Sequence, residues 1–201
     1  MNPNDLSRVS HKLSWLLRHG ARESKLAMDS AGWSSIEDVL SIVRVPRPVL
    51  DAVVRDNNKA RYEVQGGRIR ACQGHSFEGT PVTLEGLESS WAVDPRSEPI
   101  WHGTSIDALA SIASQGLLPG ERTHVHLAGE THSKVGKRAG VDVLLRVEPE
   151  KLRAAGLTLY RSPNGVILAR SVPPSCITAL RAESRRARDQ EHELKRLFNI
   201  A

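Results

Sequence analysis

Cysteine is scarce in this sequence, with two residues among 201. Cys72 and Cys176 stand far apart, and neither belongs to a CxxC pair or to another spacing typical of metal ligands. Such a sequence supports neither a disulfide framework nor a cysteine-based zinc site. The chemistry of the chain must therefore be sought in other side chains.

Long apolar runs are also missing. No segment approaches the roughly 20 apolar residues that a membrane-spanning helix needs, and the first residues, MNPNDLSRVS, lack the hydrophobic stretch of a secretory signal. We therefore expect a cytoplasmic protein that does not enter a membrane. The apolar share of 39% suffices for a packed core, and the net charge of +5 is compatible with a polyanionic partner without requiring one.

Residues 1–80 are predicted to form three helices followed by two strands. Apolar periodicity and helix start signals place the helices at Leu6–His19, Ile36–Val43 and Pro48–Asn57. The segment "RYEVQGGRIRACQ" then alternates polar and apolar residues around two glycines, which predicts a hairpin with Tyr62 and Val64 opposite Ile69 and Ala71. Helices followed by such a hairpin are typical of a winged-helix module.

The rest of the chain favours a second domain of the α+β class. Residues 81–97 contain prolines and acidic residues without a sustained period, so we interpret them as a linker. Residues 98–182 contain short strand candidates ("IWHGT", "HVHLA", "VDVLLRVEP", "LTLYRSP", "GVILARSVP") around helices at "SIDALASIASQG" and "THSKVGKRAG". Residues 183–201 predict one charged helix with opposite charges three and four residues apart.

The end of the first helix, "LRHG", carries Arg18 and His19, which its apolar stripe does not need. One explanation is a helix cap, since cations favour the negative end of the helix dipole and Gly20 can take the left-handed stop conformation. The other is a phosphate site, because similar residues recur at element ends in "IRACQGHS" (Arg70, His75) and in "ERTHVHLAG" (Arg122). Arg70 alone is equally explained as a polar residue of the wing.

Two histidine motifs occur in the second domain. In "WHGTS", His102, Gly103 and Thr104 lie between a strand and a helix, where backbone and small side chains can approach a ligand or where Thr104 or Ser105 can cap the helix. In "HVHL", His124 and His126 share one face of a strand. This spacing suits a metal, but no convincing third ligand is near, so we expect no metal.

Taken together, these segments and "LAMDSAGWSSIEDVL", "VGKRAGVDVLLRV" and "NGVILA" resemble the tRNA 2′-phosphotransferase family, known in bacteria as KptA. The resemblance implies a winged-helix lobe joined to an ADP-ribosyltransferase-like lobe, with the RNA 2′-phosphate held in a cleft between them and NAD⁺ consumed as co-substrate. It also implies a place in tRNA splicing or RNA repair. We expect a monomer whose partners are NAD⁺ and RNA with an internal 2′-phosphate.

The implied reaction has two steps. An RNA 2′-phosphate oxygen attacks the nicotinamide ribose, which releases nicotinamide and leaves a 2′-phospho-ADP-ribosylated RNA. The ribose 2″-hydroxyl then attacks the phosphate, which frees the RNA 2′-hydroxyl and ADP-ribose 1″,2″-cyclic phosphate. By motif position, the resemblance assigns catalysis and phosphate binding to Arg18, His19, Arg70 and Arg122. His75, which stands in the same segment as Arg70, is a further predicted substrate-binding residue.

The resemblance also implies residues that bind NAD⁺. They are His102, Gly103 and Thr104 in "WHGTS", His126 and Leu127 in "HVHL", and Val166 in "NGVILA". Arg138 in "VGKRAG" either reaches the pyrophosphate or closes a helix. The sequence departs from the family pattern at Lys25, where relatives often have glycine, at Trp101, where tyrosine is common, and at Ala128, where serine is frequent.

Two other functions remain open at this stage. One is an ADP-ribosyltransferase that caps 5′-phosphate ends of nucleic acids, which the resemblance permits as a side activity. The other is a winged-helix DNA-binding regulator that senses NAD⁺. The third predicted helix, "PRPVLDAVVRDNN", offers few side chains that could read bases, so the sequence favours the enzyme.

Overall fold

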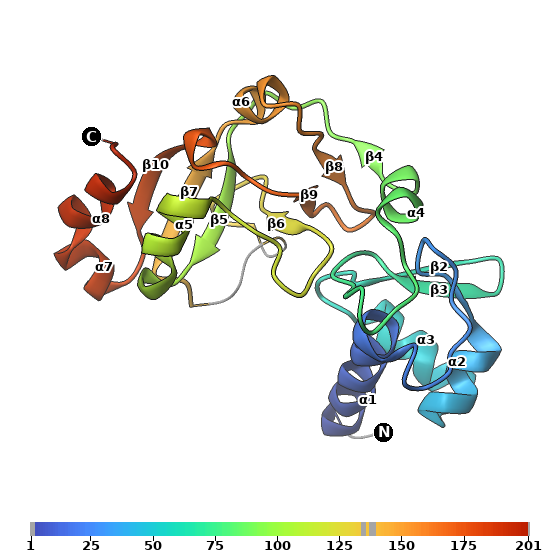
Figure 1. Ribbon diagram of the computed structural model, residues 1–201. Helices are drawn as coiled ribbons and strands as arrows, with labels where there is room; N and C mark the ends of the chain where they lie inside the picture. The colour runs from blue at the N-terminus through green and yellow to red at the C-terminus, as the bar shows by residue number, and fades with distance from the viewer. Residues whose placement is uncertain (1–2, 134–135, 137–139, 201) are drawn as a thin grey trace. The chain divides into compact units, whose positions relative to one another are not determined.

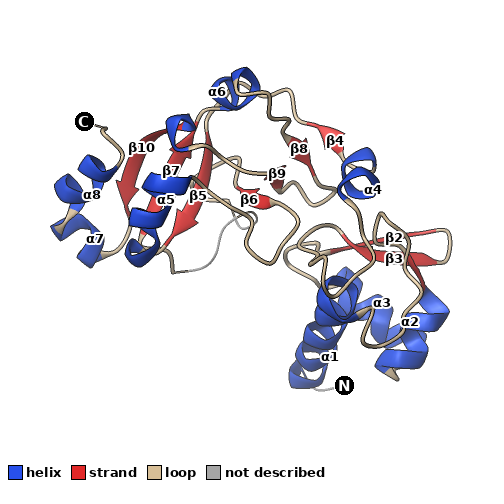
Figure 2. Cartoon of the chain, in the orientation of Figure 1, coloured by secondary structure: helices blue, strands red, loops and turns tan. Residues whose placement is uncertain are grey.

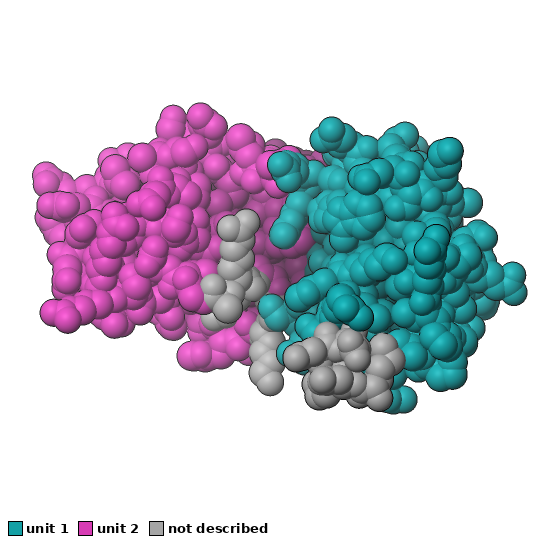
Figure 3. Space-filling view, turned by 90° about the horizontal axis from the view of Figure 1, so that it is seen from below, with its two compact units in different colours: residues 1–92, 121–123 teal, residues 93–120, 124–201 magenta. Residues whose placement is uncertain are grey.

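The structure is a computed structural model, and it describes residues 3–133, 136 and 140–200 (Figure 1). The chain folds into two compact units, which Figure 3 colours separately. Unit 1 comprises residues 1–92 and 121–123, and unit 2 comprises residues 93–120 and 124–201. Helices and short antiparallel sheets occur in both, so the protein belongs to a mixed class compatible with the α+β prediction (Figure 2).

Three helices pack against one small sheet in unit 1 (Figure 2). They are α1 (Pro3–Trp15), α2 (Ile36–Val43) and α3 (Arg47–Arg55), and the sheet has the order β1 (Ser34–Ser35), β3 (Arg68–Ala71), β2 (Tyr62–Gln65). The predicted hairpin register is confirmed, because Tyr62 pairs with Ala71 and Val64 with Ile69. Gly66 and Gly67 both have positive φ (55° and 77°), as a tight hairpin turn requires.

The core of unit 1 is built by the apolar faces of these elements. Val9, Leu13, Leu16 and Leu17 project from the first helix at helical spacing and are buried with residues of α2, α3 and β3. The second helix has the predicted bounds, and the side chain of Ser35 caps it by accepting a hydrogen bond from the amide of Glu37 (3.1 Å).

The first helix ends differently from the prediction. After α1 the chain continues as a π-helical turn, η1 (Leu16–Gly20), and Ala21 is still right-handed helical (φ −61°, ψ −44°). The left-handed stop expected at Gly20 is therefore wrong. Gly20 instead leaves room for the indole ring of Trp15, because a Cβ at this position would lie 2.5 Å from that ring.

The left-handed residue that ends this helical segment is Lys25 (φ 52°). The amide of Leu26 donates to the carbonyl of Ala21 (2.8 Å) and that of Lys25 donates to Arg22 (3.1 Å), which together form a Schellman motif. This geometry explains why a glycine suits the position at which the sequence has lysine. The left-handed conformation costs a residue with a Cβ about 1 kcal/mol relative to glycine.

We therefore predict that Lys25→Gly raises the free energy of unfolding by about 1 kcal/mol, which corresponds to a rise in Tm of roughly 3 °C for a protein of this size. Thermal unfolding followed by circular dichroism measures the change. Lys25→Ala is the matched control, because it removes the same exposed side chain and keeps the Cβ. If alanine stabilises the protein as much as glycine, the backbone explanation is wrong.

The segment that we interpreted as a linker, residues 81–97, contains regular structure. The helix α4 (Leu84–Ser89) starts at Thr83, whose side chain accepts a hydrogen bond from the amide of Gly86 (3.0 Å), and β4 (Ala92–Val93) follows. A helix of only six residues leaves too little periodicity to be recognised from the sequence.

Two antiparallel sheets form the centre of unit 2. One has the order β10 (Ile177–Ala182), β7 (Val143–Val147), β5 (Ile100–Thr104), and the other has the order β4, β8 (Tyr160–Arg161), β9 (Ile167–Ala169), β6 (Val125–Leu127). The five predicted strand segments are confirmed, whereas β10 was not predicted. A backbone bridge between Trp101 and Ala128, with hydrogen bonds of 2.9 and 2.8 Å, connects β5 to the chain directly after β6.

Short helices accompany the sheets of unit 2. The 3-10 turn η2 (Ile106–Ala108) and α5 (Leu109–Gln115) confirm the helix expected at "SIDALASIASQG". The elements α6 (Pro149–Ala154) and η3 (Pro174–Cys176) were not predicted. The helix expected at "THSKVGKRAG", together with Arg138, falls largely on residues outside the described ranges.

The charged C-terminal segment forms two helices, α7 (Arg185–Asp189) and α8 (Glu191–Leu197), where we expected one. The break lies at Gln190, whose backbone leaves the helical region (φ −117°, ψ 9°). The charged side chains suit the dipoles of two separate helices. Basic residues occupy the last turn of each helix, and Glu191 and Glu193 lie in the first turn of α8. Across the described parts of the chain, no helix has the length and apolarity needed to cross a membrane.

Candidate functional site

The π-helical turn of unit 1 carries Arg18 and His19, which do not belong to the hydrophobic core of this unit. Leu16, Leu17 and Gly20 of this turn are buried, whereas Arg18 is half-buried and His19 is exposed. The widened turn changes the direction in which successive side chains leave the helix, and such turns are frequent at functional sites. The Nε of Arg18 is buried and has no hydrogen-bond partner among the described residues.

The loop that follows β3 packs onto this turn, and we call its residues 73–80, which begin with "QGHS", the QGHS loop. The amide of Ser76 donates to the carbonyl of Arg18 (2.9 Å), and the Oγ of Ser76 lies 3.3 Å from the same carbonyl and 3.2 Å from Nδ1 of His19. If the hydroxyl donates to Arg18, Nδ1 of His19 donates to the hydroxyl. Ser76 then fixes the tautomer of His19 and directs its other ring nitrogen away from the loop.

Glycine makes this close packing possible. Gly79 lies so near the backbone of His19 that an added Cβ would overlap its carbonyl oxygen. The loop is also held by Arg22, whose amide donates to Gly79 (3.0 Å) and whose Nε donates to the carbonyl of Thr80 (3.0 Å).

Arg122 joins the same unit from a distant part of the sequence. The segment 121–123 belongs to unit 1, where Arg122 forms a backbone bridge with Ser76 and the amide of Thr123 donates to the carbonyl of His75 (3.0 Å). The structure thus brings Arg18, His19 and Arg122 together, as the interpretation as a phosphate site requires.

The electrostatics of this cluster are those of an anion site. Burial, and then the positive charges of Arg61 and Arg122, lower the pKa of Arg18 to about 10. Partial burial of the imidazole, and then the positive charges of Arg18 and Arg122, hold the pKa of His19 below its usual value. An anion that binds among these side chains would favour their charged forms and so remove part of this electrostatic repulsion.

Arg70 lies on β3 and is buried with a different set of partners. Its guanidinium donates to Glu63 (2.7 Å) and to the Oγ of Ser90 (2.7 Å), and it stacks over the ring of Trp33 at 4.6 Å from the centroid. It follows Ile69 and precedes Ala71, both of which face the core, so its side chain projects from the opposite face of the hairpin. These contacts account for its orientation, and its assignment to catalysis stays a prediction.

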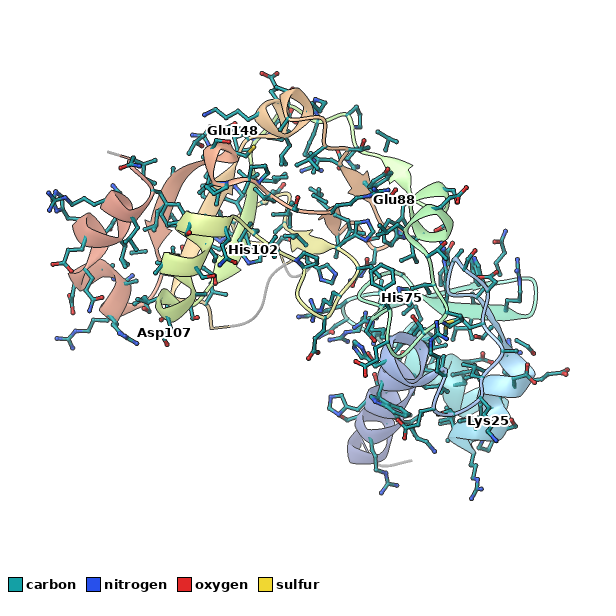
Figure 4. All side chains as sticks on the ribbon, in the orientation of Figure 1. Lys25, His75, Glu88, His102, Asp107 and Glu148 are labelled. Carbon is teal, nitrogen blue, oxygen red and sulfur yellow. The ribbon has the colours of Figure 1, made fainter. Side chains whose placement is uncertain are left out.

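His75 is fully buried in unit 1, in the loop after β3 (Figure 4). It packs against Gly32, whose φ is 86° and where a Cβ would lie 2.7 Å from Nε2 of the imidazole. An imidazole with no exposed surface positions the loop, and its contribution to substrate binding also stays a prediction.

In unit 2, His102 lies in the middle of β5 (Figure 4). Its Nδ1 donates to the carbonyl of His126 on β6 (3.1 Å), and both imidazoles are half-buried. His124, by contrast, is buried and makes an edge contact with Tyr160. The bridge between Trp101 and Ala128 therefore holds two of the predicted NAD⁺-binding histidines beside each other.

The other predicted NAD⁺-binding residues differ in exposure. Gly103 is buried in β5 and Thr104 is half-buried at its end. Leu127 and Val166 are almost completely buried, and Leu127 belongs to the core of unit 2, so neither presents its side chain at the surface. Arg138 lies outside the described residues. Within the described ranges no group of three or more His, Cys, Asp or Glu side chains could hold a metal ion.

Comparisons with known proteins identify the family. Residues 4–171 match the model of the "RNA 2'-phosphotransferase, Tpt1 / KptA family". The chain belongs to this family. Among similar proteins, a "Probable RNA 2'-phosphotransferase" of Burkholderia lata is 37% identical over 178 residues, which cover 84% of this chain and 88% of the relative.

Two further similar proteins carry the same name. Proteins with the same name from Pseudomonas syringae and Pyrobaculum aerophilum are 36% and 34% identical, over 89% and 85% of this chain and 96% and 79% of the relatives. The matched region of the family model contains the π-helical turn, the QGHS loop, Arg122 and the two histidine strands. Sequence reasoning had found the charged residues of these motifs but not Ser76, Arg61 or the contacts of Trp33.

Proposed function

We propose that this protein removes an internal 2′-phosphate from RNA and transfers it to ADP-ribose derived from NAD⁺, yielding RNA with a 2′-hydroxyl, nicotinamide and ADP-ribose 1″,2″-cyclic phosphate. The observation that carries the proposal is the cationic cluster of Arg18, His19 and Arg122 in a chain of the RNA 2′-phosphotransferase family. The winged-helix character of unit 1, the ADP-ribosyltransferase-like character of unit 2, and the divisions at residues 80, 97 and 182 belong to the same proposal.

The cluster suits an RNA 2′-phosphate. Arg18 and Arg122 supply planar guanidinium groups, which bind phosphate oxygens through charge-assisted hydrogen bonds and stabilise the additional charge of a phosphoryl-transfer transition state. Arg18 has a buried Nε without a partner among the described residues, so part of its hydrogen-bonding capacity is unused in the protein alone.

NAD⁺ fits the chemistry of the residues around β5 and β6. The half-buried imidazole of His102, the hydroxyl of Thr104 and the backbone at Gly103 are groups that bind ribose hydroxyls. NAD⁺ supplies the ADP-ribosyl group that accepts the phosphate. We assign its binding to these residues with His126, Leu127, Val166 and Arg138, of which Leu127 and Val166 contribute through the backbone because their side chains are buried.

His19 is suited to move a proton at the phosphate. Because its pKa is lowered, the imidazole is mainly neutral near pH 7. The negative charge of a bound phosphate would counteract the positive charges of Arg18 and Arg122 and so raise the pKa of His19. Phosphate binding should therefore be coupled to proton uptake by His19. The resulting imidazolium can donate to the RNA oxygen that leaves when the phosphate is transferred.

This coupling gives a testable titration. We predict that the pKa of His19, followed by NMR through its ring protons, lies below 6.5 in the free protein and rises when adenosine 2′-monophosphate binds. Because the folded-state pKa is below the unfolded value, the same group removes stability as the pH falls through this range. An unchanged pKa of His19 would contradict the coupling.

Incubation with NAD⁺ and an oligoribonucleotide carrying one internal 2′-phosphate tests the function directly. We expect release of nicotinamide, RNA with a 2′-hydroxyl and the cyclic phosphate, separated by chromatography and identified by mass. Accumulation of ADP-ribosylated RNA alone would favour the capping activity. If neither product forms, the proposed function is wrong.

A further inference from the structure

A polar groove runs along α1 in unit 1 and ends at Arg18. It has a volume of about 480 Å³ and lies between α1 on one side and the end of α3 with the turn that follows it on the other. One wall carries Ser7, Ser10, His11 and Ser14, and Arg18 closes its inner end. One end of the groove is therefore formed by Arg18, a residue of the proposed phosphate site, and the rest of the groove extends away from that site along α1.

The wall on α1 is rich in serine. Ser7, Ser10 and Ser14 follow one another at three- and four-residue spacing, beside the face on which Val9, Leu13 and Leu17 are buried. Serine is a poorer helix former than the alanine, lysine or glutamate that commonly occupy such faces. Helix stability therefore does not explain this stripe, whereas short hydroxyl side chains leave space for a ligand and can donate hydrogen bonds to it.

The opposite wall adds positive charge. Arg61 lies in the turn after α3, and its Nη1 donates to the amide oxygen of Asn57 (3.2 Å), which carries no charge to neutralise it. Its charge lowers the pKa of Arg18, so the two guanidinium groups act on one another across the inner part of the groove. Asp56 also lines the groove, but its carboxylate is paired with Arg55 (2.9 Å).

These features fit a ribose–phosphate backbone. Serine and asparagine side chains bind phosphate and sugar oxygens, and arginine neutralises phosphate charge. The wall from Ser7 to Ser14 extends for about 10 Å at the helical rise of 1.5 Å per residue. Phe, Tyr and Trp are missing from the described residues that line the groove, and hydroxyl, amide and guanidinium groups outnumber the single imidazole ring of His11 there.

We propose that this groove binds the RNA backbone next to the 2′-phosphorylated nucleotide. The proposal rests on the proposed function for the position of the 2′-phosphate at Arg18 and adds the path of the flanking chain. Recognition here is independent of base identity, because hydroxyl, amide and guanidinium groups contact the backbone. Ser14 and Arg61 act by positioning the RNA, and Arg18 joins the groove to the reacting phosphate.

Two variants test the groove through binding, without NAD⁺ and without turnover. Ser14→Glu places a negative charge on the α1 wall, and Arg61→Gln removes a positive charge from the opposite wall. The two probes are an oligoribonucleotide with one internal 2′-phosphate and adenosine 2′-monophosphate, which has no flanking backbone. We expect each variant to raise the Kd of the oligonucleotide at least tenfold and that of the mononucleotide less than twofold.

The salt dependence provides a second measurement. Loss of one phosphate contact in Arg61→Gln should reduce the slope of log Kd against log salt for the oligonucleotide by about 1. The matched controls are Ser41→Glu on α2 and Arg47→Gln on α3, which make the same charge changes at exposed positions outside the groove. Both controls should bind the oligonucleotide as the unchanged protein does.

The outcomes separate this inference from the proposed function. Equal weakening of both probes would assign Arg61 to the phosphate site itself and overturn the proposed path. Unchanged oligonucleotide binding in both variants would exclude the groove as the RNA path. If the unchanged protein binds the 2′-phosphorylated oligonucleotide through the groove but forms no product with NAD⁺, the proposed function fails and the groove stands.

Discussion

Arg18→Ala is expected to slow removal of the RNA 2′-phosphate by at least about a hundredfold, because loss of one charged donor at a developing negative charge costs roughly 100- to 1000-fold in rate. The variant should also bind adenosine 2′-monophosphate more weakly. The measurement is kcat/KM with a 2′-phosphorylated oligonucleotide at saturating NAD⁺. Turnover close to that of the unchanged protein would mean that Arg18 serves only the helix.

The stability of the same variant distinguishes a site residue from a structural one. Burial and neighbouring positive charges disfavour the charged form of Arg18 in the folded protein, and its buried Nε has no partner among the described residues. Removing the guanidinium should therefore leave Tm unchanged or raise it, although the activity is lost. Its carbonyl, which accepts from Ser76, is retained in every variant.

Arg18→Lys is the matched control for charge. Lysine keeps one positive charge but lacks the planar fork that binds two phosphate oxygens together. We expect an intermediate loss of roughly tenfold, less than that of alanine. If lysine restores full activity, the site requires only a cation and the bidentate interpretation is wrong.

Local sequence patterns predicted the elements whose geometry depends on near neighbours. The apolar spacing from Ile36 to Val43 and the serine before it determine α2, because the helix face and its cap lie within nine residues. Alternation around Gly66 and Gly67 determines the register of the hairpin in the same way. These features require no information about distant parts of the chain.

The end of the first helix could not be predicted in this way. Gly20 follows two cations and therefore resembles a helix cap, but the helical backbone continues through Ala21, and the ring of Trp15 lies where a Cβ on Gly20 would stand. The cap lies at Lys25, a residue that local statistics do not favour in the left-handed conformation.

The candidate site combined predictable and unpredictable parts. The residue types of Arg18, His19 and Arg122 indicated a phosphate site, but only the fold shows that residues 121–123 join unit 1. For Arg70, the hairpin register that the sequence predicts places Glu63 on the opposite position of the partner strand, whereas the stacking on Trp33 could not be indicated because it arises from loop packing. Charged residues reveal chemistry in a sequence, whereas their partners depend on contacts between distant segments.

Gly79 provides a test in which no functional group is removed. A Cβ at this position would overlap the carbonyl oxygen of His19, so Gly79→Ala must displace the QGHS loop from the π-helical turn. Overpacking of this kind costs roughly 1–3 kcal/mol of stability. Because Ser76 of the same loop contacts both Arg18 and His19, we also expect kcat/KM for 2′-phosphate removal to fall about a hundredfold, the effect of displacing reacting groups by about 1 Å.

Gly86→Ala is the matched control for this prediction. A Cβ on Gly86 in α4 would overlap the carbonyl of Ser30, so the variant suffers the same kind of backbone clash within unit 1. Its stability should fall by a similar amount, but kcat/KM measured well below its Tm should remain near that of the unchanged protein. Equal kinetic losses in both variants would show that overpacking anywhere in unit 1 impairs the enzyme. A loss confined to Gly79→Ala would establish that the contact between the loop and the helical turn sets the positions of Arg18 and His19.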